Sequence, residues 1–293
     1  MKRNSLRRTP FTFTLPLFLV YTAMLIIPIA VALALSFTSW NGFVTSPIEF
    51  NGIKNYIAMF SDPKLGAAIK VTVKITVIVA VVDNVLGLLF ALLLNKPGKL
   101  TTSARTILFI PYILSSVAIS FIWMAILSST GILNSFLNAI GLSQWAGNYF
   151  GSETSSLTCI IIVEIWRTLG FHMVIYLAAL QTVPSDLYEA CTVDGGSAWD
   201  KFIHVTLPMI IPGVTVSVLM GIINELRIYD IIRVLTGGGP GTSTQSITYS
   251  IVQQAYSKNR MGYSSAIAVF LFVAIILISV IWLKVTSKLE VEE

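Results

Sequence analysis

The chain has 293 residues, of which 55% are hydrophobic and only 11% charged, and its mean hydropathy is +0.81. Average soluble domains carry about 25% charged residues, so this composition excludes a protein whose surface faces mostly water. The net charge of +5 is modest, and we expect no nucleic-acid partner. The two cysteines, Cys159 and Cys191, show neither metal-ligand spacing nor a disulfide framework, so we expect no metal site.

Six stretches of about 20 mostly apolar residues predict an all-α integral membrane protein with about six transmembrane helices. Lipid offers the backbone no hydrogen-bond partners, so each span must be helical or line a cavity. The first stretch is longer than the core of a secretion signal, which is about 7–15 residues, and we expect it to remain as a helix. The predicted spans are 14–37, 68–94, 106–128, 155–180, 208–235 and 262–284.

The distribution of basic residues predicts the orientation, because cytoplasmic loops carry an excess of lysine and arginine. With the N-terminus inside, ten basic residues fall on the cytoplasmic side and six on the other. This favours a cytoplasmic N-terminus (1–13), a transmembrane domain (14–284) and a cytoplasmic C-terminus (285–293). The ten are Lys2, Arg3, Arg7, Arg8, Lys96, Lys99, Arg105, Lys201, Lys284 and Lys288, and the six are Lys54, Lys64, Lys70, Lys74, Lys258 and Arg260.

The predicted cytoplasmic loop 181–207 departs from this rule, since it holds four acidic residues and one lysine. Charge alone allows a solvated turn. Its pattern predicts a short helix from Pro184 to Val193, capped by Ser185, and a second helical piece from Ala198 to Val205. Exposed apolar side chains on such a loop need a partner to cover them.

Residues 189–208 of this loop read EACTVDGGSAWDKFIHVTLP, which resembles the EAA loop of bacterial ABC import permeases. Cys191 and Val205 depart from the motif by small or isosteric changes. Segments resembling carbohydrate-type permeases follow in order along the chain: 39–42, 51–56, 108–112, 179–184 and 235–241. The motif positions are Glu189, Ala190, Gly195, Leu207 and Pro208, with Asp194 preceding the glycine.

The resemblance implies a type I ABC importer permease in the bacterial cytoplasmic membrane, with a sugar or oligosaccharide as cargo. It implies that the loop is a coupling helix docked on an ATPase subunit, with Glu189 paired to a basic residue there. The implied partners are two ATPase subunits, an extracytoplasmic solute-binding protein, membrane lipid and a second, paralogous permease. The chain itself would be no enzyme and hold no cofactor, with ATP and Mg bound by the ATPase subunits.

The glycine-rich segment 237–241 is no phosphate-binding loop, because no lysine followed by serine or threonine comes after its glycines.

Ionisable side chains inside predicted spans are costly and mark either structural ion pairs or functional sites. Glu164 and Arg167 have helical i,i+3 spacing, as do Asp230 with both Arg227 and Arg233. The resemblance to the maltose-transporter permease further implies a substrate cavity. Its implied lining residues are Tyr112, Ser116, Trp166, Leu169, Gly170, Met173, Asn224, Glu225 and Ile228.

Two alternatives remain open from the sequence. The same machinery could import a glycerol phosphate, an amino acid or a polyamine, and Arg227 and Arg233 would suit an anion. An ion-coupled secondary transporter could use Asp83 or Glu164 as its carrier, although such folds usually contain internal repeats and none is evident.

Overall fold

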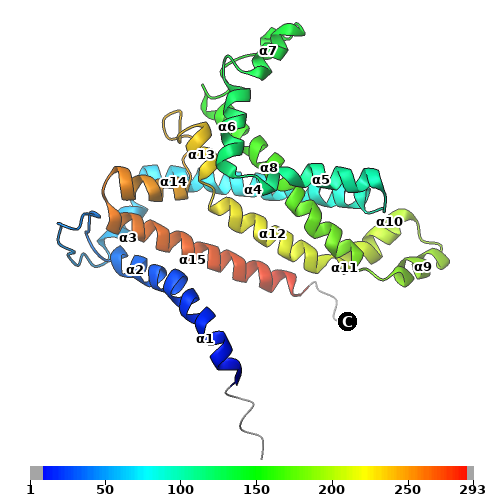
Figure 1. Ribbon diagram of the computed structural model, residues 1–293, viewed down its shortest axis with the longest axis horizontal. Helices are drawn as coiled ribbons and strands as arrows, with labels where there is room; N and C mark the ends of the chain where they lie inside the picture. Colours follow the sequence, from blue (N-terminus) through cyan, green and yellow to red (C-terminus); the bar gives the residue numbers. More distant parts are fainter. Residues whose placement is uncertain (1–8, 289–293) are drawn as a thin grey trace, which may run out of the picture. The chain divides into compact units, whose positions relative to one another are not determined.

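A computed structural model describes residues 9–288, and the regular structure in this range is helical (Figure 1). The expected cytoplasmic termini, 1–13 and 285–293, lie partly outside the described residues. The helices are α1 Thr9–Tyr21, α2 Ile27–Ser36, α3 Lys54–Phe60, α4 Pro63–Leu94, α5 Lys99–Ile113, α6 Ser116–Leu127, α7 Ile132–Ala139, α8 Glu153–Gln181, α9 Ser185–Val193, α10 Ala198–Lys201, α11 Leu207–Met209, α12 Ile211–Leu226, α13 Asp230–Leu235, α14 Ile247–Val252 and α15 Met261–Thr286.

Six helical segments of the described chain are long and apolar enough to cross a membrane, which confirms the predicted number. They are Thr14–Ser36, Pro63–Leu94, Ser116–Ala139, Glu153–Gln181, Ile211–Leu235 and Met261–Thr286.

The third predicted span, 106–128, is not one helix. The chain leaves the helical conformation at Leu114 and Ser115, whose backbones are extended, and α5 and α6 lie on either side. Pro111 lies near the end of α5 and cannot donate a backbone hydrogen bond, which weakens the helix where it stops. The apolar segment that can span the membrane therefore starts at Ser116.

The fifth predicted span, 208–235, is also interrupted. α12 ends at Leu226, α13 begins at Asp230, and the three residues between them are not helical. The stretch around this break is less apolar than the rest of the span, since it holds Asn224, Glu225, Arg227, Asp230 and Arg233, but these residues alone did not predict a loss of helix. Irregular backbone at membrane depth is tolerated where it lines a cavity.

Contacts divide the chain into two compact units. The first holds residues up to 62 together with 251–272. Here Asn55 donates from its amide to the carbonyl oxygens of Ser36 and Thr38, at 2.9 and 2.8 Å. The hydroxyl of Tyr263 donates to Asp62 at 2.9 Å. These bonds fasten the loop after α2 and the start of α15 within this unit.

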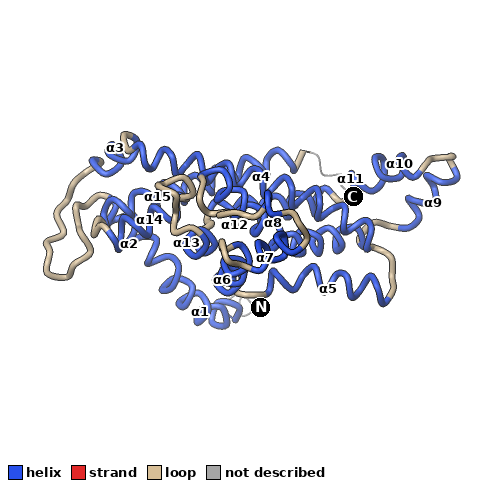
Figure 2. The backbone as a smooth tube through the Cα atoms, turned by 90° about the horizontal axis from the view of Figure 1, so that it is seen from above, coloured by secondary structure: helices blue, strands red, loops and turns tan. Residues whose placement is uncertain are grey.

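The second unit, residues 63–250 and 273–288, is built around α8, which packs against α4, α5 and α12 (Figures 1 and 2). Half of the apolar window of α8 is buried, a larger share than in the other candidate spans of the described chain. Beside it, α6 packs on α13, and the two short helices α9 and α10 lie away from α13.

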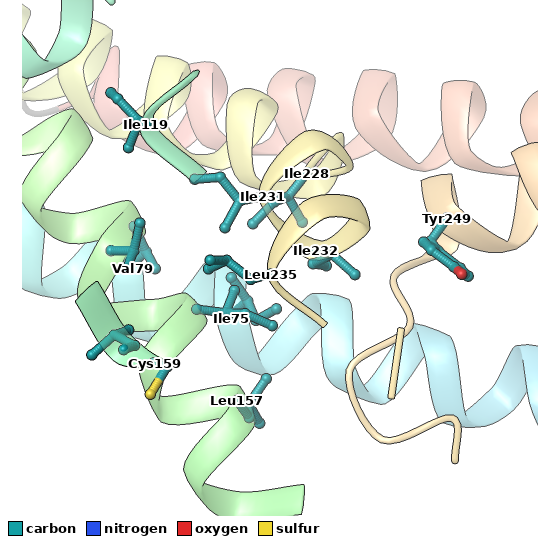
Figure 3. Close-up of a cluster of buried hydrophobic side chains, with 13 residues drawn as sticks. Ile75, Val79, Ile119, Leu157, Cys159, Ile228, Ile231, Ile232, Leu235 and Tyr249 are labelled. Carbon is teal, nitrogen blue, oxygen red and sulfur yellow. The ribbon is translucent and has the colours of Figure 1, made fainter. Parts of the chain in front are cut away.

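A buried apolar cluster joins α4, α6, α8 and α13 in this unit (Figure 3). Ile75 of α4 lies beside Ile231, Ile232 and Leu235 of α13, all at most 5% exposed. The side chains of α13 are thus held against α4 and α8, although α13 has only six residues. This packing fixes the direction in which the chain leaves the break at residues 227–229.

Polar side chains also join the three central helices. The hydroxyl of Thr168 on α8 donates to Asp83 of α4 at 2.5 Å, and Nε2 of His172 lies 3.6 Å from the same carboxylate. On its other side, His172 shares a hydrogen bond of 2.8 Å with Ser217 of α12. Interhelical hydrogen bonds of this kind contribute about 1 kcal/mol each in membrane proteins.

The backbones of α8 and α5 touch at Gly170. A Cβ built there would collide with the backbone of Leu108 and Phe109. Small residues at such crossings let membrane helices approach closely. Gly170, which the sequence analysis assigned to a substrate cavity, therefore has a packing role in this structure.

We expect Gly170→Ala to destabilise the detergent-solubilised protein by about 1–3 kcal/mol, because the clash is with backbone that cannot rotate away. Gly66→Ala is the matched control, since nothing lies within 4 Å of a Cβ there and Gly66 is also helical. Thermal unfolding measures both. Equal unfolding temperatures for the two variants would contradict the close approach.

Candidate functional site

A polar cavity of about 430 Å³ lies in the second unit, where the two interrupted spans face α8. The α5–α6 junction forms one side and the α12–α13 break another, so both nonhelical segments line the same space. Its lining residues are Tyr112, Leu114, Ser116, Glu164, Arg167, Asn224, Arg227, Ile228, Tyr229, Asp230 and Ile231.

The charges in this cavity are balanced and partly paired. The guanidinium of Arg167 forms an ion pair with Glu164, one turn away on α8, and its Nε donates to Oε2 of Glu164 at 3.2 Å. Asp230 at the start of α13 accepts a hydrogen bond from the hydroxyl of Ser116 at 2.6 Å. With Arg227, the lining holds two acidic and two basic side chains.

The i,i+3 pairs expected around Asp230 are not formed. No ion pair joins Asp230 to Arg227 or Arg233 among residues 9–288. For Arg227 the reason is the break in the helix, because i,i+3 spacing brings side chains together only where the backbone is continuously helical. Asp230 and Arg233 both lie on α13, and there the carboxylate of Asp230 is bonded to Ser116 instead. The Glu164–Arg167 pair lies within one unbroken helix and is confirmed.

Four of the nine predicted cavity residues line this space: Tyr112, Ser116, Asn224 and Ile228. The ring of Tyr112 stacks on Phe171 of α8, with 4.5 Å between centroids and 17° between planes. That stacking holds the aromatic ring at the cavity wall, and Asn224 of α12 lines the same cavity.

The other five predicted residues do not line the cavity. Met173 is fully buried in a second apolar cluster, and Gly170 lies at the crossing with α5. Glu225 is 1% exposed and lies within electrostatic range of Glu164 and Arg167. Trp166 packs edge to face on Trp123, and Leu169 is half-buried. Their assignment as ligands stays a prediction.

Sequence reasoning did not place Leu114, Tyr229 or Ile231 at the cavity. They lie there because the helices break next to them. Pro111 precedes the first break, but membrane helices tolerate proline, so it did not by itself predict one. Arg167, Arg227 and Asp230 did carry a signal, since charges in an apolar span are default candidates for a site.

The predicted coupling loop forms a second feature. α9 runs over Ser185–Val193, as predicted, but its N-cap is Pro184 and not Ser185. The chain then turns at Gly195, whose φ of +80° is a conformation that favours glycine. The hydroxyl groups of Tyr188 and Thr206 lie 3.0 Å apart and fasten α9 to the segment that follows α10.

The second helical piece of the loop begins at Ala198 as predicted and covers the predicted residues to Val205. α10 covers Ala198–Lys201, and a π-helical turn, Phe202–Thr206, follows it. Ser197 caps α10 in a reciprocal capping box with Asp200. The hydrogen bonds from the Ser197 hydroxyl and backbone hold the pKa of Asp200 below its ordinary value.

The surface of this loop is both apolar and acidic. Val193 is 87% exposed and Trp199 66% exposed, and Leu187 is exposed on the same short helix as Glu189. Among residues 9–288, Asp186, Glu189 and Asp194 form no ion pair. Ala190, Gly195 and Leu207 are exposed too, and Pro208 is half-buried. Most of the motif positions are thus accessible.

Residues 83–288 match the family model described as "Binding-protein-dependent transport system inner membrane component". The chain belongs to this family. It is a multi-pass inner-membrane permease subunit, a component of a transport system.

Similar curated proteins span almost the whole chain. A probable starch degradation products transport system permease protein, AmyD of Thermoanaerobacterium thermosulfurigenes, is 34% identical over 96% of this chain and 94% of its own length. The trehalose/maltose transport system permease protein MalF of Thermococcus litoralis is 33% identical over 94% and 92%.

Among solved structures, a chain of a bacterial ABC transporter involved in the import of the acidic polysaccharide alginate has the same fold. Its TM-score is 0.80 at 23% identity, and the match covers 96% of this chain and 95% of that one.

Removing one partner of the buried Glu164–Arg167 pair should destabilise the protein more than removing both. Arg167→Met leaves Glu164, only 2% exposed, without its cation, and breaking a buried pair costs about 3–5 kcal/mol. We expect the double variant Glu164→Gln/Arg167→Met to recover much of this loss. Unfolding temperatures in detergent measure it, and a double variant less stable than Arg167→Met would refute the pairing.

Proposed function

We propose that this chain is a permease subunit of an ATP-driven importer and translocates a sugar or oligosaccharide delivered by a solute-binding protein. The observation that carries the proposal is the polar cavity at two broken spans in a chain of the binding-protein-dependent family. Several full-length relatives are named as permeases for sugars, among them starch degradation products, trehalose or maltose, and multiple sugars.

The chemistry of the cavity suits a sugar. A ring face such as that of Tyr112 packs on the C–H face of a pyranose, and an amide such as that of Asn224 can donate to one hydroxyl and accept from another. The four charged lining residues cancel in sign, which gives no net preference for an anion. We therefore favour a neutral carbohydrate over a glycerol phosphate, an amino acid or a polyamine.

We propose that the loop 181–207 transmits conformational changes of an ATPase subunit to the transmembrane helices. Its exposed apolar groups would be covered by docking into that subunit, and its unpaired acids, Glu189 in particular, would face basic residues there. In this proposal two ATPase subunits bind ATP and Mg, a second and paralogous permease completes the pathway, and both termini lie in the cytoplasm.

An ion-coupled mechanism has less support. The carboxylate of Asp83 is buried and bonded to Thr168, and Glu164 is paired with Arg167. Both candidate carriers thus already have partners within the helix packing. A coupling free energy supplied by docked subunits would instead change the relative stability of two cavity states.

Gly195→Asp should uncouple the transporter. At φ +80° a side chain strains the turn between α9 and α10, although no atom lies within 4 Å of the added Cβ. We expect normal membrane insertion and at least a tenfold loss of ATP-dependent uptake, read from membrane vesicles.

Gly141→Asp is the matched control, because Gly141 has φ +79° and equal space but lies after α7. It should keep most of the uptake. Normal ATP-dependent uptake by Gly195→Asp would refute the coupling role of the loop.

Asn224→Ala tests the cargo site. Losing one substrate hydrogen bond costs about 0.5–1.5 kcal/mol, so uptake of subsaturating sugar should fall roughly 2- to 10-fold. Asn138→Ala, an exposed amide on α7 outside the cavity, should leave uptake unchanged. Equal uptake by both variants, with both proteins inserted, would remove Asn224 from the substrate site.

A further inference from the structure

A second cavity of the second unit is apolar and shares no lining residue with the polar cavity. It is a groove of about 500 Å³ between α4, α12 and the end of α15. Along α4 it is lined by Val73, Val77, Val81 and Val85, which recur every four residues on one face and are 47–62% exposed.

The opposite wall of the groove is fixed by packing. Ile222 of α12 and Trp282 of α15 lie there, and the indole N–H of Trp282 donates to the carbonyl of Thr215 at 3.0 Å. The amide of Asn84 also borders the groove and donates to the carbonyl of Ala80 at 2.7 Å. These groups are already bonded within the protein, so the groove suits an occupant without polar groups.

Two lysines stand at one end of this groove. Lys70 and Lys74, one turn apart on α4, border a shallow hollow of about 420 Å³ that shares Val73 and Val77 with the groove. Both are exposed, and neither forms an ion pair within the described range. Two unpaired cations beside an apolar groove favour a ligand in which an anionic group is joined to an apolar chain.

The depth of these residues agrees with that chemistry. With Leu94 at one edge of the bilayer core, the 20 residues back to Ile75 give about 30 Å of helix, the thickness of that core, and Lys70 and Lys74 then lie just beyond it at the level of the lipid headgroups. From Val73 to Val85 the groove runs about 18 Å along the helix, close to the depth of one leaflet.

We propose that this groove binds an anionic phospholipid, with Lys70 and Lys74 on the phosphate and one acyl chain along the valine face of α4. The site lies at the end of α4 away from α9 and α10 (Figure 1). This lipid site does not depend on which substrate the protein transports. A lipid held there bridges three helices of the unit, and basic residues at a membrane surface are known to favour anionic headgroups.

The test uses the transporter as isolated from the membrane in mild detergent, incubated with equal amounts of phosphatidylglycerol and phosphatidylethanolamine. Native mass spectrometry then counts the lipid retained. We expect phosphatidylglycerol to be retained preferentially, and Lys70→Gln/Lys74→Gln to lower that preference roughly tenfold. No preference in the unaltered protein, or an unchanged preference in the variant, would overturn the proposal.

A second pair of variants tests the groove itself. Val77→Phe/Val81→Phe fills it and should lower retention of both lipids, whereas Leu89→Phe, on the same helix outside the groove and also exposed, should not. A competing occupant is a helix of a partner permease. Disulfide cross-linking of Val81→Cys to such a partner in the intact complex would establish that occupant and overturn the lipid site.

Discussion

The second unit depends on how closely α8 approaches its neighbours. At Gly170 its backbone meets that of α5. Thr168 and His172, two positions before and after Gly170, form the hydrogen bonds to α4 and α12. Apolar side chains gain little by leaving lipid for one another, so close packing and interhelical hydrogen bonds have to hold such helices together. With α8 fixed in this way, Glu164 and Arg167, one to two turns before Gly170, face the space that the interrupted spans leave open.

The cavity follows from that arrangement. Helices that ran unbroken past α8 would bury their apolar faces against it and leave no polar space. The breaks at Leu114–Ser115 and at residues 227–229 turn backbone and polar side chains toward α8, and the apolar cluster around Ile231 and Leu235 holds α13 in its new direction (Figure 3). The cost of irregular backbone at membrane depth is offset where water or substrate can reach it. The same breaks place Ser116 against Asp230, more than a hundred residues away in the chain.

Much of this could be predicted from the residues. Hydropathy indicated six spans, and α9 begins and ends close to the predicted bounds. The interruptions were not predicted. Pro111 precedes the first and polar side chains surround the second, but membrane helices tolerate both, so tertiary packing decides where the chain leaves the helix. The family resemblance correctly assigned Tyr112, Ser116, Asn224 and Ile228 to the lining of a cavity. It also assigned Met173 and Gly170, which in this fold pack against neighbouring helices.

The central claim is that the cavity is opened and closed by ATP through the loop 181–207. The most direct measurement is sugar uptake into proteoliposomes that contain the purified transporter, with ATP enclosed and the sugar-loaded binding protein outside. The account predicts uptake only when both are present and none from a proton or sodium gradient alone. Uptake driven by an ion gradient without ATP or binding protein would contradict it.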